Sequence, residues 1–291
     1  MIIMNPSSGR AEARDYIEAA ETALHSAGYQ VTTRETAAEG DATAFCRLAC
    51  REGYDLVVAV GGDGTLHETM NGLADQECRP KLAVVPMGTV NDFARALQIP
   101  LNPADAVRTL SSSRVQRVDM GRLNDRLFVN VVAAGSLAGS LSSVTSEDKT
   151  RLGFLAYLKE GIKELTGNHV HPLRITYDGE TWEGSSPLFL AALTNSVGGF
   201  EKLAPGAAVD DGLLHCFIIK DLHLLNSVTV SISLLLGNLR NHKDVIYFTA
   251  RQVSVSSADP VKTNVDGEEG PPLPITLSTI PRHIEVVVPE Q

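Results

Sequence analysis

Leu56-Val57-Val58-Ala59-Val60-Gly61-Gly62-Asp63-Gly64-Thr65 is the most informative stretch of the chain. Its first five residues are continuously apolar, as in a parallel strand that is covered on both faces. The three glycines let the backbone turn tightly and approach a ligand without Cβ clashes. A helix is expected from Leu66 to Leu73. Because the free N–H groups at a helix start bind anions, this strand–loop–helix unit predicts a phosphate site.

Two further loops occupy the same position after an apolar run. Met1–Met4 leads into Asn5-Pro6-Ser7-Ser8-Gly9-Arg10, and Leu82–Pro86 leads into Gly88-Thr89-Val90-Asn91-Asp92. The carboxyl ends of parallel strands meet at one sheet edge, where ligands bind in open α/β folds. Three such loops favour a nucleotide site, and Arg10 can reach a phosphate oxygen.

The glycine loop differs from the two common nucleotide fingerprints. It matches neither GxxxxGK[ST] nor GxGxxG, which counts against a P-loop NTPase and a Rossmann dehydrogenase. Asp63 would repel phosphate in a plain anion-binding loop. An aspartate there makes sense if it works with Mg²⁺ or orders the loop.

The order of elements predicts two domains. Strands and helices alternate in the first third, which implies an α/β layer fold with a mainly parallel sheet. Further elements are expected there, namely helices at 14–27, 41–52 and 103–110, a helix from about 92 to 97, and a strand at 29–33. From about residue 117 short β-rich runs predict a sandwich. The expected domains are 1–120 and 121–291, with the last strand able to return to the first domain.

The expected strands of the second domain are short and numerous. They lie at 115–123, 126–133, 173–177, 181–183, 188–194, 213–219, 245–250, 253–256, 275–277 and 284–288. Asn124-Asp125 and Asp178-Gly179 occupy hairpin-turn positions. A single helix is expected at 153–165.

Composition restricts the functional class. The chain has 291 residues, of which 43% are hydrophobic and 21% charged, so it can bury ordinary cores. The 25 basic and 35 acidic residues give a net charge of −10, which argues against a nucleic-acid binder. Without a secretory signal or a CxxC pair, the four cysteines suggest a cytosolic protein with reduced thiols. The apolar stretch Leu222–Leu236 is too short and too polar to span a bilayer.

Two acidic turns interrupt the β-rich domain. They are Asp210-Asp211-Gly212 and Val265-Asp266-Gly267-Glu268-Glu269. Each reads either as a solvated turn or as a functional site, with Asp211 as a ligand of a hard cation and Glu268 as a base.

Taken with the loops at 61–65 and 86–92, these turns resemble the diacylglycerol kinase catalytic family over essentially the whole chain. The resemblance is strongest to the soluble enzymes of Gram-positive bacteria. It implies a three-layer α/β domain of the NAD kinase and diacylglycerol kinase type, followed by a β-rich, sandwich-like domain. It also implies ATP and Mg²⁺, with ATP held by the first domain and the lipid by the second.

The resemblance assigns roles to individual residues. Those expected to bind ATP are Asn5, Pro6, Ser7, Ser8, Gly9, Arg10, Thr36, Gly62, Asp63, Gly64, Thr65, Leu66, His67, Glu68 and Thr89. His67 stands where the family commonly has Asn. Glu268 corresponds to the general base, with Asp119 as its partner carboxylate. Asp211 corresponds to a Mg²⁺ ligand, with the carbonyl groups of Ala208 and Leu213.

The expected activity is phosphorylation of diacylglycerol to phosphatidic acid. The alternatives are another lipid acceptor (a sphingoid base or phosphatidylglycerol), a more distant NAD kinase, and a non-catalytic nucleotide sensor. A homodimer is expected by analogy. Lys149, Arg151, Lys159 and Lys163 suggest a basic helix that docks on anionic lipid at the inner face of the membrane. The alternative is an ordinary core-facing helix with solvated lysines.

Overall fold

The chain folds into two compact units. The computed structural model describes residues 1–8, 13–135, 170–197, 203–220, 233 and 237–290. One unit comprises Met1–Asp119 with Arg282–Gln291, and the other comprises Met120–Pro281. The chain passes from one unit to the other along two strands, β5 (Val115–Leu123) and β16 (Ile275–Val287).

The first unit contains a parallel sheet. Its strands run in the order β2-β1-β3-β4-β16, with β1 at Ile2–Met4, β2 at Thr33–Glu35, β3 at Leu56–Gly61 and β4 at Lys81–Pro86. Every residue of β3 is buried. This agrees with the prediction from its unbroken apolar run, because a parallel strand packs against helices on both faces.

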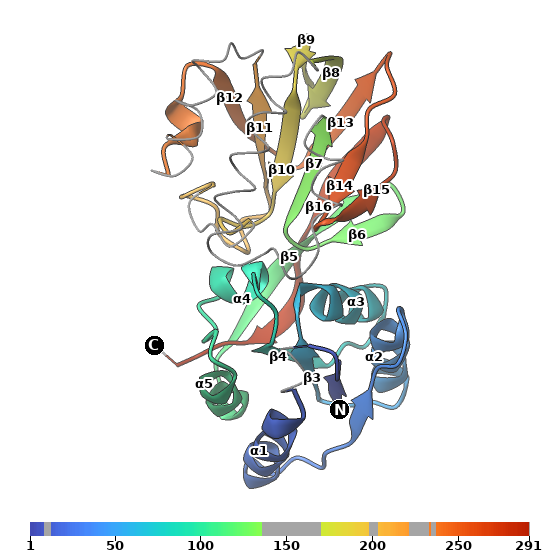
Figure 1. Cartoon of the computed structure of the whole chain (residues 1–291), viewed down its shortest axis with the longest axis vertical. Coiled ribbons are helices and arrows are strands. Elements are labelled where there is room, and N and C mark those ends of the chain that lie inside the picture. Colours follow the sequence, from blue (N-terminus) through green and yellow to red (C-terminus); the bar gives the residue numbers. More distant parts are fainter. Residues whose placement is uncertain (9–12, 136–169, 198–202, 221–232, 234–236, 291) are drawn as a thin grey trace. The chain divides into compact units, whose positions relative to one another are not determined.

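Helices form the outer layers of this unit. They are α1 (Ala13–Ser26), α2 (Asp41–Arg51), α3 (Asp63–Ala74), α4 (Asp92–Ala96) and α5 (Pro103–Arg108). Helix α2 packs on α3 and α1 packs on α5, and Figure 1 shows the two pairs on opposite sides of β3 and β4. The predicted three-layer α/β arrangement is confirmed.

The second unit is built from antiparallel strands. One sheet has the order β12-β11-β10-β7-β14-β15, and the first residues of β16 pair with β13, which pairs with β8 and then β9. The strand bounds are β6 Arg126–Phe128, β7 Val131–Gly135, β8 His171–Tyr177, β9 Glu180–Ser186, β10 Leu188–Ala192, β11 Leu214–Ile219, β12 Val245–Ala250, β13 Gln252–Ser257, β14 Thr263–Val265 and β15 Glu268–Gly270. Buried side chains of both groups, including Phe189 and Val253, share one core. The predicted sandwich-like architecture is confirmed.

Several predicted elements differ from the structure. The strand expected at 29–33 lies at Thr33–Glu35, and the single strand expected at 126–133 is divided into β6 and β7. The two strands expected at 275–277 and 284–288 are one continuous strand, β16. Its middle was missed because the partly or fully exposed residues 278–283 carry no regular apolar pattern.

Other expectations concern the turns, the thiols and the possible membrane segments. Asn124 and Asp178 both have a positive φ, as expected of hairpin turns.

All four cysteines are free, and Cys46, Cys50 and Cys216 are buried. Burial raises the pKa of the Cys46 thiol to about 12. Within the described part of the chain, every helix is too short or too polar to cross a membrane. The helix expected at 153–165 lies outside the described residues, as does nearly all of Leu222–Leu236.

Candidate active site

The loop after β1 contacts the glycine loop after β3 in the first unit. The Asn5 side-chain amide donates to the Thr65 hydroxyl over 3.3 Å, and the Asn5 backbone N–H donates to the Val60 carbonyl over 3.0 Å. The Asn5 side-chain oxygen accepts from the Ser7 N–H over 2.9 Å. Both loops follow neighbouring parallel strands, so their contact places two predicted phosphate loops at one sheet edge.

The glycine loop also touches the loop after β4. A Cβ on Gly62 would lie 3.3 Å from the Gly88 Cα, and one on Gly88 would lie 2.9 Å from the Gly62 Cα and 2.7 Å from the Asn91 side-chain oxygen. The two backbones therefore approach at a distance that only glycine permits. This close approach explains why both loops carry glycine at these positions.

Asp63 holds the loop after β4 in place. Its two carboxylate oxygens accept hydrogen bonds from the backbone N–H groups of Asn91 at 2.9 Å and Asp92 at 3.1 Å. Asn91 has a φ of 54°, and its side chain bonds both backbone groups of Gly88. Of the two roles considered for Asp63, ordering a loop is the one that these contacts support.

Helix α3 begins at Asp63, three residues before the expected start at Leu66. Gly62 is its N-cap, and the structure shows no side-chain cap for the first turn. The N–H groups of a first turn lack partners within the helix and favour negative charge. The glycine loop therefore leads into a helix start that is able to bind an anion, which is the chemistry that its composition predicts.

The remaining ATP-site candidates occupy varied positions in this unit. The Glu68 carboxylate accepts from the Ala42 N–H over 3.2 Å, so it caps the start of α2. Thr36 is half-buried and its N–H donates to the Met4 carbonyl, whereas Thr89 is exposed. Asp41 accepts from Ala37 and Ala38 in the loop after Thr36, and these backbone bonds lower the pKa of Asp41. Gly9 and Arg10 lie outside the described residues.

Asp119 is buried, and it is the last residue of the longer of the two chain segments that form the first unit. It is 3% exposed, and its carboxylate accepts from the Arg282 N–H over 2.7 Å. Arg282 has a φ of 51° and opens the second segment of the same unit. Asp119 therefore links the two segments of the first unit, while Glu268 belongs to the second unit.

Glu268 is presented by the β14–β15 hairpin of the second unit. The turn residues Asp266 and Gly267 both have positive φ, at 51° and 96°, as in a type I′ turn. The Glu268 side chain is 57% exposed, and one carboxylate oxygen lies 3.6 Å from an Arg126 guanidinium nitrogen. Because the carboxylate is exposed, it is accessible to a substrate hydroxyl, as a general base must be.

Asp266 and Arg126 support this hairpin, and sequence reasoning gave neither a role. The Asp266 carboxylate accepts from the N–H groups of Val129, Asn130 and Val131 at 2.7, 2.9 and 2.8 Å. These three bonds occupy the gap between β6 and β7, which is why the strand expected at 126–133 is interrupted. The Asp-Gly turn signal was visible in the sequence, but its partners are about 135 residues away.

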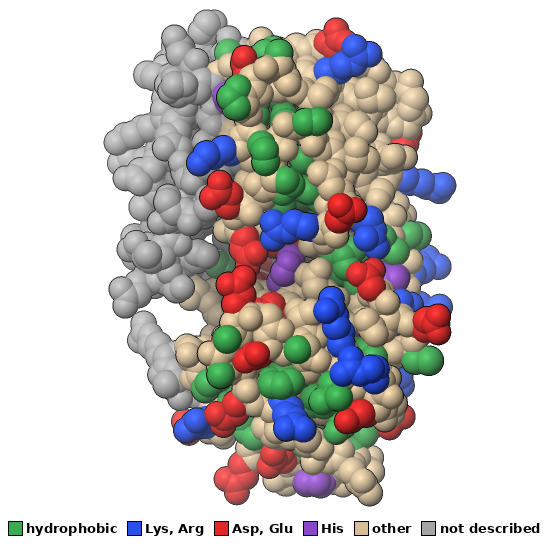
Figure 2. Space-filling model, turned by 90° about the vertical axis from the view of Figure 1, so that its right-hand side faces the viewer, with side chains coloured by type: hydrophobic (Ala, Val, Ile, Leu, Met, Phe, Trp, Pro, Cys, Tyr) green, Lys and Arg blue, Asp and Glu red, His purple; other side chains and the backbone are tan. Residues whose placement is uncertain are grey.

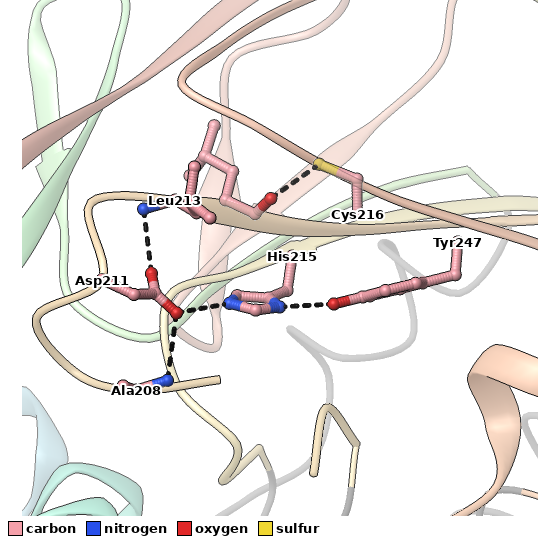
Figure 3. Close-up of polar contacts among 7 residues, drawn as sticks. Ala208, Asp211, Leu213, His215, Cys216 and Tyr247 are labelled. Atoms are coloured by element: carbon pink, nitrogen blue, oxygen red, sulfur yellow. Dashed lines mark hydrogen bonds and ion pairs between the residues drawn. The ribbon is translucent and has the colours of Figure 1, made fainter. Parts of the chain in front are cut away.

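Asp211 lies in the loop before β11 and is held by three donors (Figure 3). Its oxygens accept from the Leu213 N–H at 2.9 Å and the Ala208 N–H at 3.1 Å. A nitrogen of the buried His215 ring lies 2.9 Å from the oxygen that faces Ala208. The three predicted metal-site residues therefore belong to one compact loop.

The donor set of this loop fits a hydrated hard cation. Asp211 Oδ1 accepts a hydrogen bond from the Leu213 N–H and keeps an acceptor direction for an ion, and the loop carbonyl groups add further oxygens. Mg²⁺ binds oxygen, keeps several waters, and commonly uses only one or two carboxylates. Among the described residues, groups of three or more His, Cys, Asp or Glu side chains arranged to hold a metal ion are absent. A site at Asp211 would therefore depend on one carboxylate, carbonyl oxygens and water.

Two family models together match nearly the whole chain. The diacylglycerol kinase catalytic domain matches residues 1–123, and the YegS C-terminal NAD kinase beta sandwich-like domain matches residues 130–288. A diacylglycerol kinase of Bacillus subtilis is 39% identical over 291 residues, covering 100% of this chain and 96% of the relative. The chain belongs to the diacylglycerol kinase family.

Other members of the diacylglycerol kinase family agree with this assignment. A diacylglycerol kinase of Staphylococcus haemolyticus is 39% identical over 289 residues, covering 99% of this chain and 88% of the relative. The crystal structure of a putative diacylglycerol kinase from Bacillus anthracis superposes with a TM-score of 0.87 at 27% identity, covering 99% of this chain and 94% of that one. The resemblance inferred from the loops is confirmed.

The expected membrane-docking helix cannot be located in this kinase. Lys149, Arg151, Lys159 and Lys163 all lie outside the described residues. Figure 2 shows one face, on which the described Lys and Arg side chains are interspersed with Asp and Glu. A basic docking surface therefore stays a prediction from the sequence.

Proposed function

We propose that this chain is an ATP-dependent lipid kinase that phosphorylates the hydroxyl group of diacylglycerol and releases phosphatidic acid. The observation that carries the proposal is the interlocking of three phosphate-loop candidates in the first unit, in a chain whose relatives of equal length are named diacylglycerol kinases. Loops held together by Asn5, Asp63 and the Gly62–Gly88 approach form a preformed site, which favours positioning of phosphate.

The first unit would bind the nucleotide. The loop 5–10, the helix start at 62–68 and Thr89 supply N–H and hydroxyl donors for phosphate oxygens, and Thr36 lies on a neighbouring loop. Phosphoryl transfer requires mainly positioning and charge neutralisation, and the donors at the start of α3 contribute to both.

Glu268 would act as the general base. The acceptor oxygen forms a bond to the γ-phosphorus as the bond to the β,γ-bridging oxygen breaks, and ADP leaves. The hydroxyl proton passes to the Glu268 carboxylate. The exposure of Glu268 leaves its carboxylate accessible to the substrate hydroxyl. Asp119 enters the proposal as the second carboxylate of the site, by resemblance to the family.

A divalent cation belongs to the proposal as a charge-neutralising group. When bound, Mg²⁺ would offset negative charge that develops on transferring phosphate. Asp211 and the Ala208 and Leu213 carbonyl groups would hold it. Docking on an anionic membrane surface and homodimer formation are further parts of the proposal that rest on the sequence and on analogy.

The test is transfer of labelled γ-phosphate from ATP–Mg²⁺ to a panel of lipids in mixed micelles. The panel contains diacylglycerol, a sphingoid base and phosphatidylglycerol, with NAD⁺ as a separate acceptor. Label in phosphatidic acid is expected. Label in another lipid would change the acceptor, and label in NADP⁺ would replace the substrate class. ATP binding without transfer to any acceptor would favour a nucleotide sensor.

Two neighbouring glutamates provide a matched pair of variants for the base. Glu268→Gln should lower kcat by roughly 10²- to 10⁴-fold and leave ATP affinity unchanged, because it removes only the proton acceptor. Glu269 is next to it on β15, and adjacent strand residues point to opposite faces. Glu269→Gln should retain near wild-type turnover. Equal losses in both variants would contradict the assignment of Glu268 as the base.

A further inference from the structure

We propose that His215 and Tyr247 are positioning residues for Asp211, which they hold in the orientation needed to bind a divalent cation. The inference rests on the proposed cation role of Asp211. It assigns a function to two side chains that neither the motifs nor the family resemblance singled out. Figure 3 shows the three side chains in one line, with the imidazole between the carboxylate and the phenol.

The chain of contacts is short and continuous. One His215 ring nitrogen, Nε2, lies 2.9 Å from Asp211 Oδ2, and the other, Nδ1, lies 2.7 Å from the Tyr247 hydroxyl. The His215 side chain is 4% exposed and the Asp211 side chain is 23% exposed. Water therefore has little access to the imidazole, and its two polar partners are these side chains.

The Asp211 carboxylate determines the direction of the first hydrogen bond. An ionised carboxylate only accepts, so the proton of the first bond belongs to His215 Nε2. The Tyr247 hydroxyl can donate to Nδ1, which then needs no proton of its own. Burial raises the pKa of the Tyr247 hydroxyl and keeps it protonated for this role. With Tyr247 as the donor to Nδ1, the ring proton lies on Nε2 and points to Asp211.

Strand pairing fixes the geometry of the two rings. His215 lies on β11 opposite Thr249 of β12, and Phe217 lies opposite Tyr247. His215 and Tyr247 are therefore diagonal neighbours on one face of the pair. The Phe217 and Tyr247 ring centroids are 5.1 Å apart, so Phe217 packs against the phenol. Asp211, by contrast, lies in an irregular loop. The His215–Tyr247 pair, here called the dyad, lies on two paired strands and therefore holds the Asp211 carboxylate in a fixed position.

A carboxylate that must bind metal needs this kind of support. A fixed outer partner limits the carboxylate to one rotamer and leaves its remaining acceptor direction toward the ion. If the dyad were removed, the Ala208 and Leu213 N–H groups would still donate hydrogen bonds to the Asp211 carboxylate and would keep the loop folded. The dyad is therefore expected to affect cation affinity more than the folding of the loop.

The experiment measures thermal stabilisation of the full chain by MgCl₂ alone, without nucleotide or lipid. The wild-type Tm should rise with added Mg²⁺, and Asp211→Asn should abolish the rise. Tyr247→Phe removes one hydroxyl, keeps the ring packed, and should raise the Mg²⁺ concentration at the midpoint by about 10-fold. His215→Leu should do the same or more, and His215→Gln, whose amide can still donate, should recover part of the response.

Tyr177→Phe is the matched control. Tyr177 is in the same unit, its ring stacks on Phe248 of β12 at 3.8 Å, and its hydroxyl is remote in sequence from the Asp211 loop. It should leave the Mg²⁺ midpoint unchanged. If Tyr247→Phe and His215→Leu lower only the metal-free Tm and keep the wild-type midpoint, the dyad is merely structural and the proposal is overturned.

The experiment also separates this proposal from the one on which it rests. A wild-type Mg²⁺ response that Asp211→Asn leaves intact would overturn both the cation role of Asp211 and the role of the dyad. Loss of the response in Asp211→Asn with wild-type behaviour in Tyr247→Phe and His215→Leu would overturn the dyad alone. The lipid-transfer assay, run on the same variants, tests the kinase activity independently.

Discussion

At the scale of single residues, the aspartates of the motifs act mainly on the backbone. Asp63, Asp211 and Asp266 each accept hydrogen bonds from two or three backbone N–H groups. Charge-assisted bonds of this kind are stronger than neutral ones and hold a loop in one conformation. Glu268 differs, because its carboxylate is more than half exposed. This contrast supports a structural part for Asp63 and Asp266 and a chemical part for Glu268, whereas Asp211 combines its backbone bonds with the proposed cation role.

Asp266→Ala is expected to lower the free energy of unfolding by about 3 kcal/mol. The substitution removes the acceptor for three partly buried N–H groups and places alanine at a φ of 51°. Urea denaturation measures the change. Asp125→Ala, at an exposed position in the β5–β6 hairpin, is the control and should change the free energy by less than about 0.5 kcal/mol. A similarly small effect of Asp266→Ala would show that these bonds contribute little.

At the scale of elements, the proposed nucleotide site depends on how closely two strand-to-helix loops approach. Each loop alone is an ordinary βα turn. Their approach at Gly62 and Gly88 and the bonds from Asp63 to residues 91 and 92 combine them into one surface. A small displacement of one loop would therefore change the binding of phosphate at both.

Gly88→Ala is expected to weaken binding of a non-hydrolysable ATP analogue by at least about 10-fold and to cost about 1–3 kcal/mol of stability. Its Cβ would lie 2.9 Å from the Gly62 Cα of the neighbouring loop and 2.7 Å from the Asn91 side-chain oxygen of its own loop, so the two loops must separate. Calorimetric titration and urea denaturation measure the two effects.

Gly64→Ala is the control for the steric part of this prediction. A Cβ at Gly64 has open space around it, and alanine favours the helix, so stability should be unchanged or slightly higher. Loss of stability in both variants would indicate that a general sensitivity of these loops to substitution, rather than the Gly62–Gly88 approach, is responsible.

At the scale of the whole molecule, the first unit is discontinuous in sequence. Residues 282–291 add the end of β16 beside β4, with Val286 opposite Leu82. The Val288 N–H donates to the Arg114 carbonyl, and the Ser112 hydroxyl donates to the Val288 carbonyl. Buried Asp119 also has a partner in this segment. The first unit is therefore complete only when residues 282–291 have joined residues 1–119.

Deletion of residues 282–291 is expected to lower the Tm of the first unit by more than about 10 °C and to abolish ATP binding. The deletion exposes the edge of β4 and leaves the Asp119 carboxylate without the Arg282 N–H. A chain that ends at Pro289 keeps the strand and should retain most of the stability. Trp182, the single tryptophan, lies in the second unit, so its fluorescence separates the two transitions. Unchanged ATP binding after the larger deletion would contradict this account.

The sequence predicted the parts of the structure that depend on local signals. The apolar run 56–60, the glycine loops and the Asp-Gly turns have short-range causes, and the structure has β3, the start of α3 and the hairpins at these places. The errors arose where a distant partner overrides the local pattern. Asp266 divides the strand expected at 126–133, and the partly exposed middle of β16 continues a strand that the apolar pattern alone would interrupt.

By itself, the sequence determined the α/β class of the first unit and the β-rich class of the second, because periodicity and loop composition are local properties of the chain. The family followed from the resemblance of its loops and acidic turns to those of known kinases. Only the tertiary structure decided what the acidic side chains do. It showed that Asp63 and Asp266 hold backbone segments 28 and about 135 residues away, and that His215 connects Asp211 to Tyr247. These contacts depend on strand register and burial, which join residues that are distant in the chain, so no local pattern of residues encodes them.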